Sequence, residues 1–252
     1  MVTRQRELLR QDALLRPYRA LHGRLFNGSD GTNGSGDPKR QNGSDGSIES
    51  NGSDGSNGNG STGRKIRSIL FTANHVGEGC STLAGNMAIY LTRAGPQRVL
   101  LLELDVLHPA RNPVVPAPRT AGVADVLSGG VALEEVVHQV PGTNLHVLAS
   151  GTPGEDLPTL FSDHAIGDLM ERLKVEYDVV VADGPIVNGG VPRVVSLTPH
   201  FDGVALVTQA NRTRRQVVQR SIETLESASD NFLGLVLNQR RFFIPAWIYS
   251  RL

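Results

Sequence analysis

A glycine-flanked turn between an apolar run and a pair of hydroxyl residues is the part of this sequence best suited to chemistry. Residues 74–82 read N-H-V-G-E-G-C-S-T. Gly77 and Gly79 allow the backbone to curl so that successive N–H groups point inward, and a helix beginning near Ser81 would extend this anion-binding nest. The arrangement is typical of a phosphate-binding loop, except that Cys80 stands where such loops carry lysine.

Two aspartates that follow apolar runs could bind a metal ion beside that loop. Asp105 ends V-L-L-L-E-L-D and stands two residues after Glu103, so both side chains of an extended segment would project to the same side. Asp183 ends Y-D-V-V-V-A-D. With the Ser81 hydroxyl, these carboxylates are oxygen ligands of the kind that hold Mg²⁺ and its waters beside a nucleotide. We therefore expect metal ligands at Ser81, Asp105 and Asp183, catalytic roles for the two aspartates, and ATP or ADP with Mg²⁺ as cofactors.

Each of these motifs also has a plainer explanation when it is taken alone. A glycine turn before a helix is common turn chemistry, and an aspartate at the end of a strand often caps a loop. The glycine loop and the two aspartate motifs follow one another at the ends of three apolar runs. This order favours a nucleotide site, because three independent signals would otherwise have to coincide by accident.

The alternation of apolar runs with amphipathic stretches from residue 65 onward predicts the fold. Patterns typical of buried strands are found at 66–72, 99–104, 145–149, 179–182, 203–208 and 233–237. Helical periodicity lies between them, for example at 165–174 and 214–227. We expect an α/β domain of the P-loop NTPase kind, with a doubly wound, mainly parallel sheet and helices on both faces. Ligands bind beyond the carboxyl ends of such strands, which is where the loop and both aspartates fall.

Composition narrows the functional classes. Twenty-five basic residues balance twenty-five acidic ones, so no overall positive field favours nucleic acid. A single cysteine excludes an intramolecular disulfide, and with no signal-peptide pattern at the amino end it favours a reducing, cytoplasmic setting. No apolar stretch approaches the roughly 20 residues needed to cross a bilayer. We expect membrane contact to be peripheral at most, at the inner face of the membrane through a partner.

Four segments differ in composition. Residues 1–26 interleave arginine with leucine in an amphipathic helical pattern, which suits a helix docked on its own domain or one on a membrane surface. Residues 27–63 contain little but Asn, Gly, Ser and Asp, which predicts a disordered linker. The P-loop NTPase-like domain is expected at 64–241. An aromatic tail at 242–252 could pack on the domain, bind a partner or lie at a membrane.

The sequence resembles the cytoplasmic domain of the bacterial tyrosine kinases of capsule and exopolysaccharide synthesis, a branch of the ParA/MinD-type P-loop proteins. The likeness runs over most of 65–238 and rests on motifs in the same order: V-G-E-G-C-S-T, V-L-L-L-E-L-D, G-V-A-D-V-L-S-G, L-H-V-L-A-S-G-T-P, Y-D-V-V-V-A-D-G-P and L-G-L-V-L-N. The resemblance implies cofactor-binding roles for Gly77, Glu78, Gly79, Cys80, Ser81, Thr82 and Asn238, the last as an adenine contact. It implies a membrane polysaccharide co-polymerase or chain-length regulator as partner, and possible homo-oligomers.

The sequence departs from the family pattern at positions tied to catalysis. Cys80 replaces the loop lysine, and Pro192 replaces an aspartate. Leu107 lies near the position at which the family usually has an arginine. The tail offers Tyr249 alone, where the family carries several tyrosines. In R-P-Y-R-A-L-H, only Arg19 is kept from the family's oligomerisation motif E-x-x-R-x-x-R.

These departures favour a regulatory, catalytically impaired relative of the kinases. Two alternatives stay open: an active ATP-dependent tyrosine kinase that obtains its cation from a partner or a second subunit, and a ParA/MinD-like ATPase. For Cys80 itself, the helix amino end predicts a lowered thiol pKa and a redox-sensitive thiolate. The plainer alternative is a small neutral residue that is tolerated where the lysine was lost.

Overall fold

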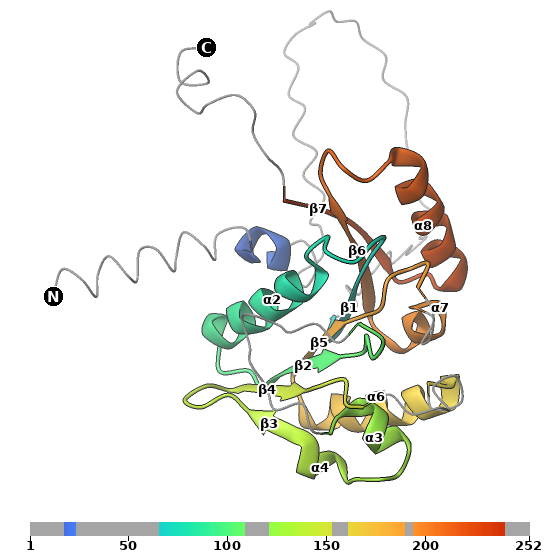
Figure 1. Cartoon of the computed structure of the whole chain (residues 1–252). Helices are drawn as coiled ribbons and strands as arrows, with labels where there is room; N and C mark the ends of the chain where they lie inside the picture. The colour runs from blue at the N-terminus through green and yellow to red at the C-terminus, as the bar shows by residue number, and fades with distance from the viewer. Residues whose placement is uncertain (1–17, 24–65, 109–120, 153–160, 190–193, 240–252) are drawn as a thin grey trace, which may run out of the picture.

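Seven strands form one sheet whose central strands carry the candidate site at their carboxyl ends. The computed structural model describes residues 18–23, 66–108, 121–152, 161–189 and 194–239. The strands are β1 Ser68–Ala73, β2 Val99–Glu103, β3 Val137–Gln139, β4 Leu145–Leu148, β5 Val179–Asp183, β6 Gly203–Gln209 and β7 Phe232–Asn238. Their order across the sheet is β3-β4-β2-β5-β1-β6-β7 (Figure 1).

The sheet confirms the predicted fold class. Every neighbouring pair of strands is parallel except β3 and β4, which are antiparallel. All six predicted strands are present, with ends that lie within two residues of the predicted ones. Strand β3 was not predicted, because its three residues V-H-Q are too few and too polar to show a strand pattern.

Helices cover both faces of the sheet. They are α2 Cys80–Ala94, α3 Val123–Leu127, α4 Leu133–Val136, α6 Asp163–Glu176, α7 Val194–Leu197, the short 3₁₀ helix η1 Thr198–His200, and α8 Arg215–Ala228. Helix α2 packs on one face, and α6, α7 and α8 contribute to the core on the other (Figure 1). The expected helices at 165–174 and 214–227 correspond to α6 and α8.

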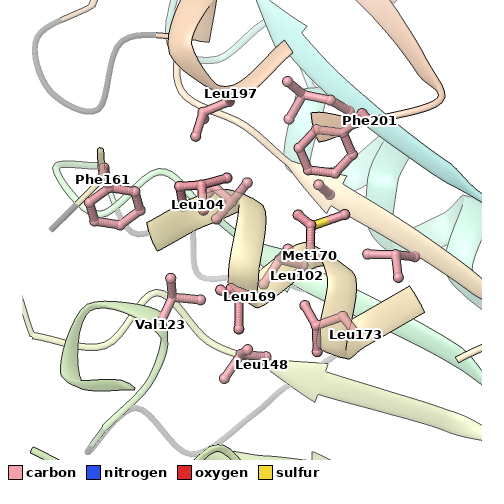
Figure 2. Packing of buried hydrophobic residues seen from close by; sticks show 14 of the residues in the cluster. Leu102, Leu104, Val123, Leu148, Phe161, Leu169, Met170, Leu173, Leu197 and Phe201 are labelled. Atoms are coloured by element: carbon pink, nitrogen blue, oxygen red, sulfur yellow. The ribbon is translucent and has the colours of Figure 1, made fainter. Parts of the chain in front are cut away.

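Strand β2 shows why the apolar runs are continuous. Its alternate residues enter different cores: Leu101 joins the cluster beneath α2, whereas Leu100 and Leu102 join the cluster beneath α6. Figure 2 shows the second cluster, in which Leu102, Met170 and Phe201 lie among other buried side chains. A parallel strand buried on both faces needs apolar residues at every position, so it carries no polar alternation.

A short helical stretch at residues 18–23 docks on α2. The Asn86 side-chain amide donates a hydrogen bond of 2.8 Å to the Tyr18 hydroxyl. The rings of His22 and Tyr90 lie 5.6 Å apart, and Leu21 packs against the core beneath α2. This part of the predicted amphipathic segment therefore contacts its own domain. The rest of 1–26, the predicted linker at 27–63 and the tail at 242–252 lie outside the described residues.

Candidate nucleotide site

The loop between β1 and α2 has the backbone of a phosphate-binding turn. Gly77 and Gly79 have φ angles of +89° and +91°, in the left-handed region that suits glycine. A β-carbon at Gly79 would also collide with the side-chain amide of Asn238. Helix α2 begins directly after Gly79, with no side-chain cap and no acidic residue in its first turn. Its first N–H groups and its positive dipole end are thus placed to bind an anion.

A pocket of about 530 Å³ opens at this loop. Its described lining joins the loop to the ends of the neighbouring strands: Ala73, His75, Val76, Gly77, Glu78, Gly79, Cys80, Ser81, Thr82, Asp105, His108, Asp183, Gly184, Ile186 and Gln239. The structure therefore brings Asp105 and Asp183 to the loop, as the order of motifs predicted. No lysine or arginine is among these described lining residues.

Asp183 receives hydrogen bonds from both residues that open α2. It ends β5, is only 3% exposed, and accepts from the Cys80 thiol and the Ser81 hydroxyl. Burial raises the pKa of Asp183 to about 6, and the nearby Asp105 carboxylate adds to the rise, whereas the two hydrogen bonds oppose it. The thiol and hydroxyl donors are neutral, so they do not offset the negative charge of this buried carboxylate. A magnesium ion bound beside it would supply the opposite charge.

The pKa of Cys80 corrects one expectation. Burial, the largest effect, and the adjacent Asp183 and Asp105 carboxylates raise the pKa of the thiol well above its ordinary value. The prediction of a lowered pKa at the helix amino end was wrong, because desolvation and two negative charges outweigh the helix dipole. The raised pKa favours a neutral thiol that donates to Asp183 and argues against the redox-sensitive thiolate.

Asp105 lies just beyond β2 and is held by the chain that follows it. Its carboxylate accepts from the His108 backbone N–H at 3.0 Å, and the His108 ring Nδ1 lies 3.4 Å from the same oxygen. Glu103 is opposite Asp183 in the sheet and is 4% exposed, but it is not among the residues that line the pocket. Of the two carboxylates expected on one side of the segment, Asp105 is the one at the pocket.

The oxygen groups that the sequence indicated as metal ligands all line the pocket: the Ser81 hydroxyl and the carboxylates of Asp105 and Asp183. No cluster of three His, Cys, Asp or Glu side chains within the described part of the chain could enclose a metal ion. Such a cluster is not needed for Mg²⁺, since this ion usually keeps several waters and takes one or two protein ligands plus phosphate oxygens.

Two residues expected to touch the nucleotide also hold the loop. Glu78 is 3% exposed, and its carboxylate accepts from Asn74 and His75 backbone N–H groups. The Asn238 side-chain amide donates to the Glu78 carbonyl oxygen at 2.9 Å, and Asn238 is not among the described residues that line the pocket. The adenine contact at Asn238 stays a prediction.

Sequence reasoning overlooked Gln239 and His108. The Gln239 side chain lines the pocket and donates to the Gly77 carbonyl at 3.0 Å. Its place directly after V-L-N at a strand end was the available signal. Leu107 is 43% exposed, while Pro192 and Tyr249 lie outside the described residues.

Comparison with known proteins finds relatives that share most of the described domain. No protein-family model matches the chain. Tyrosine-protein kinase CpsD of Streptococcus agalactiae is 28% identical over 179 residues, which cover 71% of this chain and 77% of CpsD. Tyrosine-protein kinase YwqD of Bacillus subtilis is 27% identical over 181 residues, covering 72% of this chain and 76% of YwqD. The chain is a homologue of the bacterial tyrosine kinases.

Solved structures extend the likeness to the bacterial tyrosine kinases into three dimensions. The VpsO kinase domain is 26% identical with a TM-score of 0.64, over 70% of this chain and 86% of that domain. The MinD protein of Pyrococcus horikoshii, solved with Mg-ADP, has a TM-score of 0.56 at 22% identity, over 73% of this chain and 76% of MinD. MinD at this identity shows only that the fold is shared with P-loop ATPases. Within the described residues, no helix is long and apolar enough to span a membrane.

Proposed function

We propose that this protein is a tyrosine-kinase-like regulator of exopolysaccharide or capsule synthesis that binds ATP or ADP with Mg²⁺ weakly and transfers phosphate poorly. Its homologues are tyrosine kinases, and its pocket retains a glycine loop, a free helix amino end and two aspartates. The observation that carries the proposal is the neutral Cys80 thiol at the lysine position, facing Asp183 rather than offering a cation.

The roles of the site residues follow from their positions. The backbone of Gly77, Gly79 and the first turn of α2, including Thr82, would hold the phosphates. Ser81, Asp105 and Asp183 would hold Mg²⁺ and its waters. The bound ion would neutralise charge on the phosphate oxygens.

Loss of the lysine should affect catalysis more than binding. A hydrogen bond to a charged group contributes about 1.5–3 kcal/mol, so its absence weakens nucleotide binding by roughly tenfold to a hundredfold. In the transition state, removal of one preorganised charge stabiliser costs about a hundredfold or more in turnover. A nucleotide could thus still occupy the pocket while phosphoryl transfer is nearly lost.

Restoring the cation tests this proposal. Cys80→Lys is expected to tighten Mg-ADP binding by roughly tenfold to a hundredfold in isothermal titration calorimetry, and to raise autophosphorylation with ATP. Cys80→Met is the matched control, because it fills similar space with a side chain that carries no charge. Equal autophosphorylation by the wild type and Cys80→Lys would show that catalysis is not impaired, and the proposal would fail.

A second candidate, an active kinase whose cation comes from elsewhere, is supported by one observation. Ser81, Asp105 and Asp183 all remain at the pocket, although a scaffold would need none of them. The cation would come from a second subunit or from a membrane polysaccharide co-polymerase or chain-length regulator, acting at the inner face of the membrane. Kinase assays with and without the cytoplasmic segment of that partner separate the two candidates. Phosphotyrosine that forms only with the partner favours the second candidate.

A further inference from the structure

The Glu78 carboxylate is the centre of a hydrogen-bond cluster inside the phosphate-binding loop. One oxygen, Oε2, accepts from the Asn74 backbone N–H at 2.8 Å, the Asn74 side-chain amide at 3.2 Å and the His75 backbone N–H at 3.3 Å. The other oxygen, Oε1, accepts from the Thr213 hydroxyl. Asn74 is also tied to β6, since its side-chain amide donates to the Thr208 hydroxyl at 3.1 Å.

This arrangement has an energetic reason. A carboxylate that is 3% exposed has lost most of its water and needs protein donors in its place. Its alternative is to turn outward to solvent, which would bring a negative charge into a pocket that already holds Asp105 and Asp183. The donors therefore hold the Glu78 carboxylate in a buried position and replace the water that it has lost.

Thr213 reaches the loop from a distant part of the chain. It lies in the turn between β6 and α8, where Asn211 adopts a φ of +60° and the Thr213 N–H donates to the Gln209 carbonyl at 3.3 Å. This turn fixes the position of the hydroxyl. Thr213 itself is not among the described residues that line the pocket, so it would act on a ligand through Glu78.

The loop is held from β7 as well. The side-chain amides of Asn238 and Gln239 donate to the carbonyls of Glu78 and Gly77. These bonds restrain the loop backbone, whereas the Thr213 bond restrains the Glu78 side chain. The two sets of contacts are separate, so the Thr213 contribution can be removed by itself.

We propose that Thr213 is a positioning residue for nucleotide binding, which keeps the Glu78 carboxylate inside the phosphate-binding loop and the loop in its binding shape. The inference rests on the proposed nucleotide-binding function for its consequence, but the anchoring contact exists without a ligand. It gives the turn between β6 and α8 a direct connection to the phosphate site.

The test compares Thr213→Val, which removes the hydroxyl at nearly constant volume, with Thr213→Ser, which keeps it. Thr224→Val in α8 is the control, because the Thr224 hydroxyl donates to the Arg220 carbonyl and not to the loop. In nucleotide-free protein, Thr213→Val is expected to speed amide hydrogen exchange at residues 74–78 by about tenfold. Mg-ADP affinity in calorimetry should fall by about fivefold to tenfold, and the serine and control variants should stay near wild type.

A double-mutant cycle tests the route of the effect. In a Glu78→Ala background the hydroxyl has lost its acceptor, so adding Thr213→Val should change exchange at 74–78 less than twofold. Unchanged exchange in Thr213→Val, or an equal effect of Thr224→Val, would overturn the inference. If the wild type binds no Mg-ADP, the nucleotide part of the proposed function fails and the binding role of Thr213 fails with it. The exchange comparison in nucleotide-free protein still decides whether Thr213 anchors the loop.

Discussion

The thiol of Cys80 donates a hydrogen bond to the carboxylate of Asp183, which joins the first residue of α2 to the last residue of β5. In a lysine-bearing loop a cation would stand at this place beside the strand-end aspartate. Here the partner is neutral, and the aspartate is buried at a pocket whose described lining carries no lysine or arginine. The site's dependence on magnesium, pH and thiol chemistry follows from this pair.

Removal of magnesium should weaken nucleotide binding. The pocket carries the carboxylates of Asp105 and Asp183, and its described lining offers no lysine or arginine to offset the charge of a polyphosphate. With excess EDTA, ADP affinity measured by calorimetry should fall at least about tenfold. Asp183→Asn should reduce the difference between the ADP affinities measured with Mg²⁺ and with EDTA, since it removes one of the charges that repel the phosphates. Equal affinity with and without Mg²⁺ would contradict the assigned metal ligands.

Stability without magnesium should depend on pH through Asp183. Its folded pKa of about 6 lies above the ordinary aspartate value of 3.8, so the folded state binds this proton more tightly than the unfolded state does. The corresponding stability is present below pH 3.8 and is lost as the pH rises to about 6. The pKa difference changes the free energy of unfolding by about 3 kcal/mol at most.

Asp183→Asn isolates that contribution. Urea unfolding in EDTA should show that the variant gains stability relative to the wild type as the pH is raised from 4 to 7. Asp230→Asn is a control for surface charge, because Asp230 is an exposed residue between α8 and β7. A constant stability difference between the wild type and Asp183→Asn across this range would show that the pKa of Asp183 is not raised.

Cys80 should react slowly with thiol reagents. Its raised pKa leaves little thiolate at pH 8, so the native protein should react at least about tenfold more slowly than an unfolded chain. Asp183→Asn should speed the reaction, because it removes the nearest negative charge and an acceptor for the thiol proton. Cys80 is the single cysteine, so the measured rate belongs to it alone. A native rate equal to that in guanidinium would contradict a raised pKa.

The docking of residues 18–23 should depend on the Tyr18 hydroxyl. Tyr18→Phe leaves the Asn86 amide without this acceptor and should speed hydrogen exchange in 18–23 by roughly fivefold, as expected for a bond worth about 1 kcal/mol. Asn86→Ala should have a similar effect, and the double variant little more. Additive effects of the two changes would indicate that the hydrogen bond does not hold this segment.

The strands could be predicted closely, because a strand that is buried on both faces is apolar at nearly every position, and such a run is visible in the sequence. The apolar run 99–104 became β2 Val99–Glu103, and 203–208 became β6 Gly203–Gln209. Strand β3 has no such apolar run, since it is a three-residue edge strand that depends on pairing with β4. Its existence is decided by a partner strand rather than by its own residues.

The candidate site could be predicted in part. Gly77, Gly79, Ser81, Asp105 and Asp183 meet at one pocket because parallel strands bring their carboxyl ends to the same edge of the sheet. Thr213 and Gln239 could not be found in this way. A single threonine or glutamine in a turn carries no pattern, and its partner becomes visible only when β6 and β7 are placed beside β1.

The sequence by itself determined the kind of site, through the glycine loop, the cysteine at the lysine position and the order of the strand-end aspartates. Only the tertiary structure decided how these groups act on one another. Cys80 and Asp183 are about a hundred residues apart, and the pKa of each depends on burial and on charges that other strands bring close. The orientation of Glu78 depends in the same way on Thr213. Local sequence carries a residue's intrinsic chemistry, whereas desolvation and through-space charge are properties of the assembled fold.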